Sequence, residues 1–284
     1  MNLREALKQG VHDLRAANVP SSTLAAELLL MHIVGGSRAW LYAHIDDPFD
    51  SSAAERYRDL ICQRAAGTPT QYLTGHQEFW GFDLEVTADV LIPRPETEHV
   101  VEVALARLGQ HRSFQPLRLA DVGTGSGCLA IALAKELPAA RIYATDISPR
   151  ALAVARRNAA RHDVTERIVF LETPLLAGFP PRSLDVVVSN PPYVACKDLA
   201  SLPREVREHE PQVALFAGEE GMAVYPPLIA EAAERLVVGG LLVVELGYDV
   251  SERVEALLDA ADWHEIRITN DLAGIPRVLA ADRL

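Results

Sequence analysis

The most chemically informative residues of the chain are Asn190, Pro191, Pro192 and Tyr193, which follow one another. Two successive prolines remove two backbone donors and hold an extended turn, so nearby carbonyl groups are left without local partners. With the side-chain oxygen of Asn190, the Pro191 carbonyl could accept both hydrogens of an NH2 group, while the Tyr193 ring stacks on the flat group that carries it. A proline turn with no binding role could have the same sequence. Because this turn closes a predicted buried strand beside a glycine-rich loop, we favour a binding site.

The glycine-rich loop follows an apolar strand and opens a helix. Its residues are Gly123, Thr124, Gly125, Ser126 and Gly127. The glycines allow a tight turn and let a ligand approach the backbone. A dinucleotide fingerprint would need a sixth-position glycine, where this chain has Cys128. The G-x-G-x-G pattern instead resembles the first motif of class I methyltransferases, which bind S-adenosylmethionine, and a nicotinamide site stays open as the alternative.

Two acids and one cysteine stand close to this loop in the sequence. Asp146 ends the next predicted strand, where a carboxylate can accept hydrogen bonds from both ribose hydroxyls of an adenosine. Asp121 stands where the methyltransferase resemblance implies an acid near the amino group of the cofactor. Cys128 begins a predicted helix, where a thiolate could be stabilised. No histidine or second cysteine is near it in the sequence, so we expect a small packed side chain.

The two motifs together predict methyl transfer to nitrogen. A nitrogen whose lone pair is delocalised into a carbonyl or an aromatic ring is a poor nucleophile, and two acceptors would orient it toward the methyl carbon. A sulfonium methyl group is already activated. Catalysis can therefore rest on positioning, worth up to about 7 to 11 kcal/mol in well-oriented cases, and on charge stabilisation. We expect neither a metal nor a strong general base.

These residues lie where predicted strands and helices alternate. The strands are expected at 117–122, 141–146, 168–172, 184–189, 241–246, 264–270 and 277–281, and the helices at 128–137, 149–161, 225–237 and 250–260. Such alternation predicts an α/β fold with a parallel, doubly wound sheet that binds ligands at the carboxyl ends of its strands. Residues 194–225 form a connection long enough to suggest a functional cover over the site.

The first 70 residues predict a small helical domain. Leu3, Ala6, Leu7 and Val11 recur at helical spacing. Ser21 or Ser22 is expected to cap a helix at 24–34, which Gly35 and Gly36 end, and a further helix should span 52–66. Residues 71–95 show a period of two with a glycine bend, which predicts a β-hairpin connector. Residues 96–284 would then form the catalytic domain.

Charge and cysteine content narrow the class of protein. The chain carries a net charge of −12, of which residues 71–284 hold −11, so a protein bound to nucleic acid phosphates is disfavoured. Three widely spaced cysteines suggest free thiols in a reducing cytoplasm. The N-terminus lacks the pattern of a signal peptide, and the longest apolar run is far shorter than the roughly 20 residues needed to span a bilayer. We expect a cytoplasmic protein with no membrane partner.

The motifs as a set resemble the HemK/PrmC family, the protein-(glutamine-N5) methyltransferases of peptide chain release factors. Besides the loop and the proline turn, they are Q-Y-L-T-G at 71–75, E-F-W-G at 78–81, L-I-P-R-P-E-T-E at 91–98, D-I-S at 146–148, E-V-R-E-H-E-P at 205–211 and D-L-A-G at 271–274. The resemblance covers residues 71–284 in motifs and the helical part in layout only. It implies a seven-stranded, Rossmann-like class I methyltransferase domain behind an all-helical domain that helps to dock the protein substrate.

The resemblance also implies residue roles. The loop from Gly123 to Gly127, Asp146 and Asn190 would contact S-adenosylmethionine, and residues 190–193 would hold the substrate glutamine and carry catalysis. Arg94 and Glu96 either border the same cavity or form a polar linker. Where some relatives have an acid and an aromatic residue beside the adenine, this chain has Leu175 as an apolar wall.

The expected reaction is methylation of the glutamine in the Gly-Gly-Gln motif of class 1 release factors. A DNA amino-methyltransferase would share the proline motif but would need a basic surface, against which the net charge of −11 counts. A ribosomal-protein glutamine methyltransferase is the nearer alternative, and the stretch at 93–98 favours release factors over it. A cofactor-binding module without activity is the third alternative.

Overall fold

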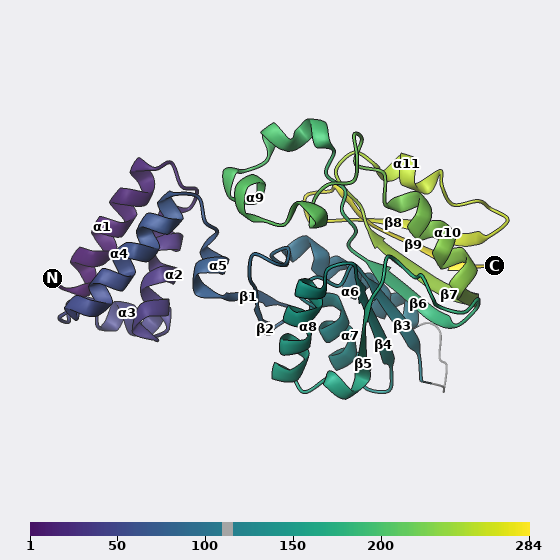
Figure 1. Ribbon diagram of the computed structural model, residues 1–284, viewed down its shortest axis with the longest axis horizontal. Coiled ribbons are helices and arrows are strands. Elements are labelled where there is room, and N and C mark those ends of the chain that lie inside the picture. Colours follow the sequence, from purple (N-terminus) through teal and green to yellow (C-terminus); the bar gives the residue numbers. More distant parts are fainter. Residues whose placement is uncertain (110–115) are drawn as a thin grey trace. The chain divides into compact units, whose positions relative to one another are not determined.

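The computed structural model describes residues 1–109 and 116–284, which form two compact units (Figure 1). Unit 1 comprises Met1–His76 and Leu202–His209, and unit 2 comprises Gln77–Ser201 and Glu210–Leu284. The expected division placed residues 96–284 in one domain, whereas the short segment 202–209 belongs with the helical unit. The chain therefore passes between the units three times.

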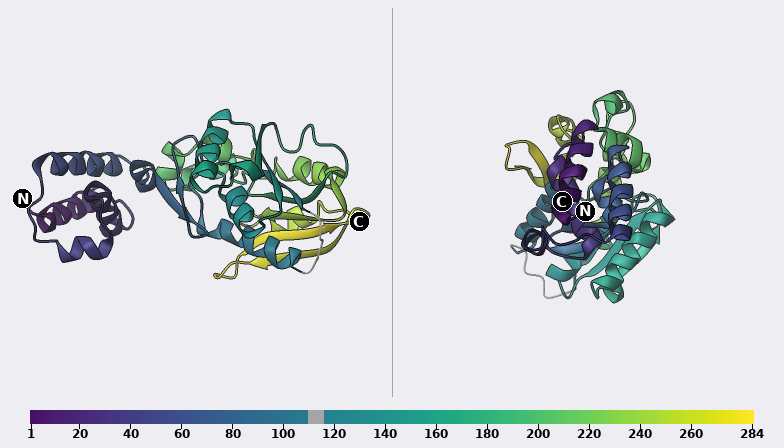
Figure 2. Two further views of the ribbon diagram at one scale, coloured as in Figure 1. Left: turned by 90° about the horizontal axis from the view of Figure 1, so that it is seen from below. Right: turned by 90° about the vertical axis from the view of Figure 1, so that its left-hand side faces the viewer.

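Unit 1 is entirely helical. Its helices are α1 (Leu3–Ala16), α2 (Ser22–Val34), α3 (Arg38–Ala43), α4 (Ser51–Ala65), α5 (Thr70–Thr74) and, from the returning segment, α9 (Arg204–His209). Helices α1, α2 and α4 pack side by side (Figure 1 and Figure 2) around fully buried side chains that include Leu14, Leu29, Leu30 and Tyr57. This apolar cluster gives unit 1 a core of its own.

The ends of the helices in unit 1 show where local sequence decides structure. Asn2 caps α1 in a reciprocal capping box with Glu5, and Gly35, at a φ of 69°, ends α2 as expected. The expected serine stands at the N-cap of α2, at Ser21, but without the side-chain hydrogen bond of a cap. The backbone of Ser21 has a left-handed conformation. The Ser22 hydroxyl donates instead to the Val19 carbonyl at 2.6 Å.

The predicted connector is a β-hairpin of β1 (His76–Phe79) and β2 (Phe82–Glu85). Trp80 and Gly81 form its turn, both with positive φ, as a two-residue hairpin turn requires. Trp80 tolerates this conformation because its backbone N–H donates to Glu98 at 2.7 Å and its indole N–H donates to Glu136 at 2.9 Å. The hairpin turn is thereby fastened to the helices of unit 2.

Unit 2 is built on one seven-stranded sheet in the order β5-β4-β3-β6-β7-β9-β8. Its strands are β3 (Arg118–Val122), β4 (Arg141–Asp146), β5 (Ile168–Glu172), β6 (Leu184–Ser189), β7 (Leu236–Glu245), β8 (Trp263–Asn270) and β9 (Pro276–Arg283). The first five strands in this order are parallel, and β9 runs antiparallel to both β7 and β8. The parallel, doubly wound sheet is confirmed, with an antiparallel hairpin at one edge.

Alternate residues of the strands supply two separate cores. Val186, Val188 and Leu241 pack with one set of helices, α6 (Glu98–Leu108), α7 (Cys128–Glu136) and α8 (Pro149–Arg161). Val187 and Leu242 face the other set, α10 (Tyr225–Arg235) and α11 (Ser251–Glu255). Short 3-10 turns complete the unit: η1 (Pro95–Thr97), η2 (Thr165–Arg167), η3 (Cys196–Ser201) and η4 (Gln212–Ala214).

The elements differ from expectation in a few places. β7 begins at Leu236, ahead of the expected start at 241, because a bulge around Gly239 and Gly240 lets the strand pair with β6 at two separated points. The expected helix at 250–260 is regular only over Ser251–Glu255. The short helices α3, α5 and α9 and the longer α6 were not anticipated as separate elements.

Candidate active site

The parallel pairing of β3, β4 and β6 brings three separate motifs to one edge of the sheet. Val122, which ends β3, pairs with Ser189, which ends β6, and Asp121 pairs with Ala144 near the end of β4. The glycine loop, Asp146 and the proline turn each begin where one of these strands ends. This is the edge where parallel sheets bind ligands.

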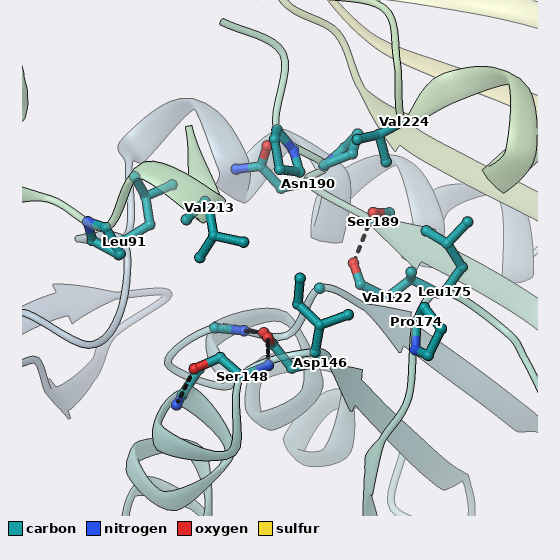
Figure 3. A pocket seen from close by; sticks show the side chains of 18 of the residues that line it. Leu91, Val122, Asp146, Ser148, Pro174, Leu175, Ser189, Asn190, Val213 and Val224 are labelled. Carbon is teal, nitrogen blue, oxygen red and sulfur yellow. Dashed lines mark hydrogen bonds between the residues drawn. The ribbon is translucent and has the colours of Figure 1, made fainter. Parts of the chain in front are cut away.

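A cavity of about 380 Å³ opens at this edge. Figure 3 shows its wall around Asp146, Leu175, Ser189 and Asn190. Its further lining comes from the strand ends, from the connector and from the segment before α10. These further lining residues include Leu91, Gly123, Gly125, Ile147, Pro174, Pro191, Pro192, Val213, Phe216 and Val224. The volume lies in the usual range for a small-molecule site.

The glycine loop exposes backbone to the cavity at Gly123 and Gly125, whose φ angles are 73° and 55°. A Cβ on Gly123 would have no atom within 4 Å. Gly127 serves packing instead, because a Cβ there would lie 3.2 Å from the Cβ of Ala155 in α8. Thr124 and Ser126 are buried and do not line the cavity. The structure thus brings two of the five predicted loop residues to the cavity wall.

Asp146 lines the cavity and is held by hydrogen bonds to backbone beside it (Figure 3). Its two oxygens accept hydrogen bonds from the backbone N–H groups of Gly125 at 3.0 Å and Ser148 at 2.9 Å. Burial raises the pKa of Asp146 above its ordinary value, against the lowering by these N–H donors. Each oxygen keeps a lone pair for a further donor, so the carboxylate can receive a pair of hydroxyl groups.

Asp121 does not line the cavity. One oxygen of its carboxylate accepts from the Thr124 hydroxyl at 2.6 Å and from the backbone N–H of Ala130 at 3.1 Å. Burial raises its pKa to about 7. In this structure the Asp121 carboxylate organises the start of α7, and its expected place near the amino group of a cofactor stays a prediction.

Cys128 is a thiol. Burial raises its pKa to about 12, and the nearby Asp121 adds to the rise. This agrees with the expectation of a packed side chain and leaves no thiolate at the start of α7.

The proline turn contributes Asn190, Pro191 and Pro192 to the cavity wall. The side-chain NH2 of Asn190 donates to the Thr97 hydroxyl at 2.9 Å. Tyr193 lies behind this wall: its hydroxyl donates to Glu245 at 3.2 Å, and a Cβ on Gly247 would lie 2.9 Å from the Tyr193 Cβ. Three of the four predicted turn residues therefore face the cavity, and Tyr193 holds the turn from the rear.

The long connection at 194–225 reaches the cavity through its second half, where Val213 and Phe216 line the wall. Arg94 and Glu96 do not line it. Arg94 instead pairs at 2.5 Å with the buried Glu210, and Glu210 also accepts from the Ile92 N–H at 3.4 Å. The connector and this part of the segment are thus joined, and the wall residue from the connector is Leu91.

The expected apolar wall at Leu175 is present, with Pro174 beside it (Figure 3), and Ile147 also lines the cavity. Leu175 has a left-handed backbone with a φ of 46°, and the next residue, Leu176, donates its N–H to Glu231 of α10 at 2.9 Å. Ile147 is more than half exposed. Ile147, Pro174 and Leu175 thus give the cavity that Asp146 lines an apolar part.

The sequence comparisons agree over nearly the whole chain. The chain is 41% identical over 280 residues to the release factor glutamine methyltransferase of Koribacter versatilis, which covers 98% of each protein. It is 43% identical over 284 residues to the enzyme of the same name from Moorella thermoacetica, covering 100% of this chain and 99% of that one. The chain belongs to the release factor glutamine methyltransferase family.

Two family models and the solved structures agree with this membership. Residues 5–75 match the PrmC N-terminal domain, and residues 103–204 match the methyltransferase small domain. The catalytic domain of hMettl16 aligns with a TM-score of 0.58 over 82% of each chain at 17% identity, which shows the fold alone. The protein is a methyltransferase of the HemK/PrmC type that uses S-adenosylmethionine.

The cavity fits this cofactor. Bare backbone at Gly123 and Gly125 leaves room for a chain of atoms, and the Asp146 carboxylate keeps acceptor capacity for ribose hydroxyls. The apolar lining at Ile147 and Leu175 suits an adenine ring. Among the described residues no cluster of His, Cys, Asp and Glu could hold a metal ion, and no helix is long and apolar enough to cross a membrane.

Two residues of the site were missed from the sequence. Thr97 and Glu245 are buried behind Asn190 and Tyr193 and join them by hydrogen bonds. Thr97 lies within the quoted motif at 91–98, but nothing in the sequence pairs it with a residue at the end of β7. A buried acid that ends an apolar strand is the one local signal that could have drawn attention to Glu245.

Proposed function

We propose that this methyltransferase acts on the side-chain amide nitrogen of the glutamine in the Gly-Gly-Gln motif of class 1 peptide chain release factors. The observation that carries the proposal is the acceptor pair at Asn190 and Pro191, which lines the same cavity as the bare glycine loop and Asp146. The relatives at 41% and 43% identity bear the corresponding name. The alternative substrates are ribosomal proteins and DNA.

The cofactor half of the cavity has roles for the loop, Asp146 and Leu175. We assign ribose binding to Asp146, the adenine wall to Leu175, and close backbone approach to Gly123 and Gly125. Thr124, Ser126 and Gly127 hold the loop in shape from behind, since they are buried or packed against α8. S-adenosylmethionine supplies a methyl carbon bonded to a positively charged sulfur.

The substrate half has roles for the proline turn. The Asn190 side-chain oxygen and the Pro191 carbonyl would each accept one N–H of the glutamine amide, and Pro192 keeps those carbonyls in place. Transfer would break the bond between the methyl carbon and the sulfur, which keeps the electron pair and becomes neutral, as the carbon–nitrogen bond forms. The two acceptors would stabilise the positive charge that the nitrogen gains until one of its protons leaves to solvent. Tyr193 would hold the acceptor turn in place from behind the wall through its hydrogen bond to Glu245.

The helical domain at 1–70 would help to dock the release factor, with 71–95 as connector and 96–284 as catalytic domain. We place the reaction in the cytoplasm, consistent with the free thiols of Cys62, Cys128 and Cys196.

The test is to incubate the protein with labelled S-adenosylmethionine and a purified, unmethylated class 1 release factor, and to map the product by mass spectrometry. One added methyl group on the Gly-Gly-Gln glutamine is expected. The matched control is the same release factor with that glutamine changed to alanine, which should take no label. Label in ribosomal protein or DNA, with none on the release factor, would overturn the proposal in favour of the corresponding alternative.

A further inference from the structure

A chain of three buried side chains lies behind the acceptor turn. Thr97, at the end of η1, is 1% exposed, and Glu245, the last residue of β7, is 0% exposed. The Thr97 hydroxyl donates to one Glu245 oxygen at 2.7 Å and accepts from the Asn190 side-chain NH2 at 2.9 Å. A carboxylate is thus linked to the substrate-facing asparagine through one hydroxyl.

The direction of these bonds fixes the orientation of Asn190. An ionised carboxylate can only accept hydrogen bonds, so the single hydroxyl hydrogen of Thr97 is committed to Glu245. Thr97 can then only accept from Asn190, which turns the NH2 of Asn190 toward Thr97. The carbonyl oxygen of Asn190 is left for the cavity that this residue lines.

The other end of the turn meets the same carboxylate. The Tyr193 hydroxyl donates to the second Glu245 oxygen at 3.2 Å, and burial raises the pKa of Tyr193, so it remains a neutral donor. Glu245 itself is held by strand pairing with Val278 and by the Tyr225 hydroxyl, which donates to its backbone carbonyl at 3.1 Å. One carboxylate therefore contacts Tyr193 directly and reaches Asn190 through Thr97.

We propose that Glu245 is a positioning residue that acts through Thr97 to present the carbonyl oxygen of Asn190, and not its NH2, to the substrate amide, and that anchors Tyr193 at the same time. The inference rests on the proposed function, because it concerns how the acceptor for that amide is oriented.

The inference predicts a pH dependence. Burial raises the pKa of Glu245 to about 7, and Glu96 adds to the rise, while Thr97, Arg277 and Tyr193 lower it. Cys128 and Tyr225 are the other titratable groups that it faces, and burial raises the pKa of both. A protonated Glu245 can donate to Thr97, which frees the Thr97 hydrogen for the Asn190 oxygen. The NH2 of Asn190 would then oppose the NH2 of the substrate, so kcat should fall as the pH drops through about 7.

The decisive variants are at Thr97. Thr97→Val keeps the shape but removes the hydroxyl, and we expect kcat to fall about 100-fold, as misplacement of a reacting group does, with KM for the release factor and cofactor affinity within about 2-fold. Thr97→Ser should restore kcat to within about 3-fold of wild type, because it returns the hydroxyl. The control is Thr145→Val, which removes a buried hydroxyl that has no hydrogen-bond partner among the residues the structure describes, and it should leave kcat and the melting temperature unchanged.

Glu245→Gln tests the carboxylate. Thr97 and Tyr193 donate to different oxygens of Glu245, and in Gln one of these positions becomes an NH2 group that cannot accept. We therefore expect kcat to fall about 10-fold at a pH of about 8 and the pH dependence near 7 to vanish. The melting temperature should hold or rise, because the variant no longer buries a charge. A Thr97→Val protein with wild-type kcat, or a Thr97→Ser protein no better than Thr97→Val, would overturn the inference.

A readout that needs no substrate separates this inference from the proposed function. In protein with isotope-labelled asparagine, the Asn190 NH2 signal, assigned from its absence in Asn190→Ala, should exchange slowly in the wild type and in Thr97→Ser and at least about 10-fold faster in Thr97→Val. If the wild type methylates no release factor, the proposed function fails while this readout still decides the network. Equal exchange rates in all three proteins would refute the network alone.

Discussion

At the scale of single residues, Asn190 is the side chain on which the chemistry depends most. It lines the cavity, its NH2 is committed to Thr97, and its oxygen is the one side-chain acceptor of the proline turn. Asn190→Ala removes that acceptor and leaves the Pro191 carbonyl, so we expect kcat to fall about 10²- to 10³-fold, the cost seen when one charge-stabilising group is removed. The loss of activity is measured by single-turnover methylation of a release factor.

The control for Asn190→Ala is Asn270→Ala, an exposed asparagine at the end of β8, which should keep wild-type turnover. Circular dichroism should show both variants folded. Near-normal turnover of Asn190→Ala would show that the acceptor of the substrate amide lies elsewhere.

The site residues at the ends of strands could be predicted from the sequence. The residues that hold them by hydrogen bonds from distant parts of the chain could not. Gly123, Asp146 and Asn190 each follow an apolar strand, so local pattern and the rule for parallel sheets place them together. Thr97 and Glu245 are 148 residues apart in the chain, and no local pattern joins them. Tyr193 was placed in the right turn, but whether its ring faces the cavity or Glu245 depends on that same distant carboxylate.

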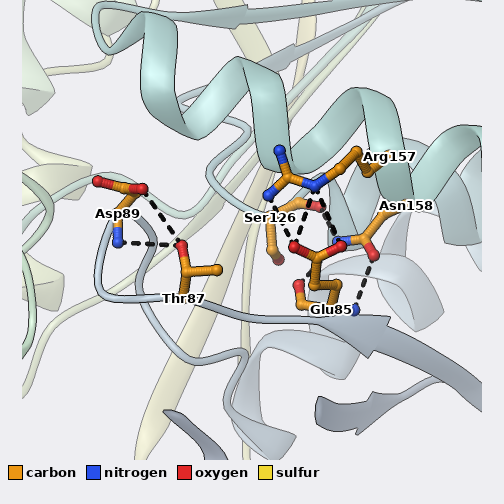
Figure 4. A network of polar contacts seen from close by, with 6 residues as sticks. All are labelled: Glu85, Thr87, Asp89, Ser126, Arg157 and Asn158. Carbon is orange, nitrogen blue, oxygen red and sulfur yellow. Dashed lines mark hydrogen bonds and ion pairs between the residues drawn. The ribbon is translucent and has the colours of Figure 1, made fainter. Parts of the chain in front are cut away.

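At the scale of elements, the glycine loop depends on how α8 and the connector hold it. Asn158 of α8 is fully buried and donates to the carbonyls of Ser126 and Glu85, both at 2.9 Å, while its oxygen accepts from the Glu85 N–H at 2.7 Å (Figure 4). Arg157 adds an ion pair to the Glu85 side chain at 2.7 Å. The two neighbouring side chains fasten β2 in different ways.

The contacts of Asn158 and Arg157 should contribute different amounts to the free energy of unfolding. Asn158→Ala removes three hydrogen bonds inside the protein and should lower the free energy of unfolding by about 3 kcal/mol, since buried polar groups that lose partners are costly. Arg157→Ala removes a half-exposed ion pair and should cost under about 1 kcal/mol. Urea unfolding of both variants measures the difference, and equal costs would contradict the assignment of Asn158 as the main tie.

The elements themselves were predictable where apolar runs have clear ends. β4, β5 and β6 match their expected bounds because a polar or turn-forming residue closes each run. Helix α6 was missed because it begins at Glu98 directly after the 3-10 turn Pro95–Thr97, and no side-chain cap marks its start. The bulge in β7 depends on where β6 lies, which the local sequence does not contain.

At the scale of the whole molecule, two units with separate cores share one chain that crosses between them three times. Almost all of the acidic surplus belongs to residues 71–284. Most of these acids lie at the surface, but Asp121 and Glu245 are buried within unit 2. Ion-paired surface carboxylates stabilise a protein more as the pH rises. We expect these two buried carboxyl groups to do the opposite and to stabilise unit 2 less as the pH rises.

The sign follows from the raised pKa of Asp121. Burial raises it to about 7 in the folded protein from an ordinary value of 3.8, so the folded state binds the proton more tightly than the unfolded state. Its contribution to the free energy of unfolding is greatest at low pH and is lost as the pH rises from about 4 to about 7. The variant Asp121→Asn cannot ionise and keeps its hydrogen-bond acceptor, so its advantage over wild type should grow by a few kcal/mol between pH values of about 5 and about 8.

The measurement needs a signal from unit 2 alone. Of the three tryptophans, Trp40 lies in unit 1 and Trp80 and Trp263 lie in unit 2, so a Trp40→Phe background makes fluorescence report on unit 2. Urea unfolding in this background, with and without Asp121→Asn, is compared at pH values of about 5 and about 8, which lie on either side of the raised pKa of Asp121. A stability difference that stays constant between the two pH values would show that Asp121 is ionised throughout, and that Thr124 and Ala130 hold a charged carboxylate at the start of α7.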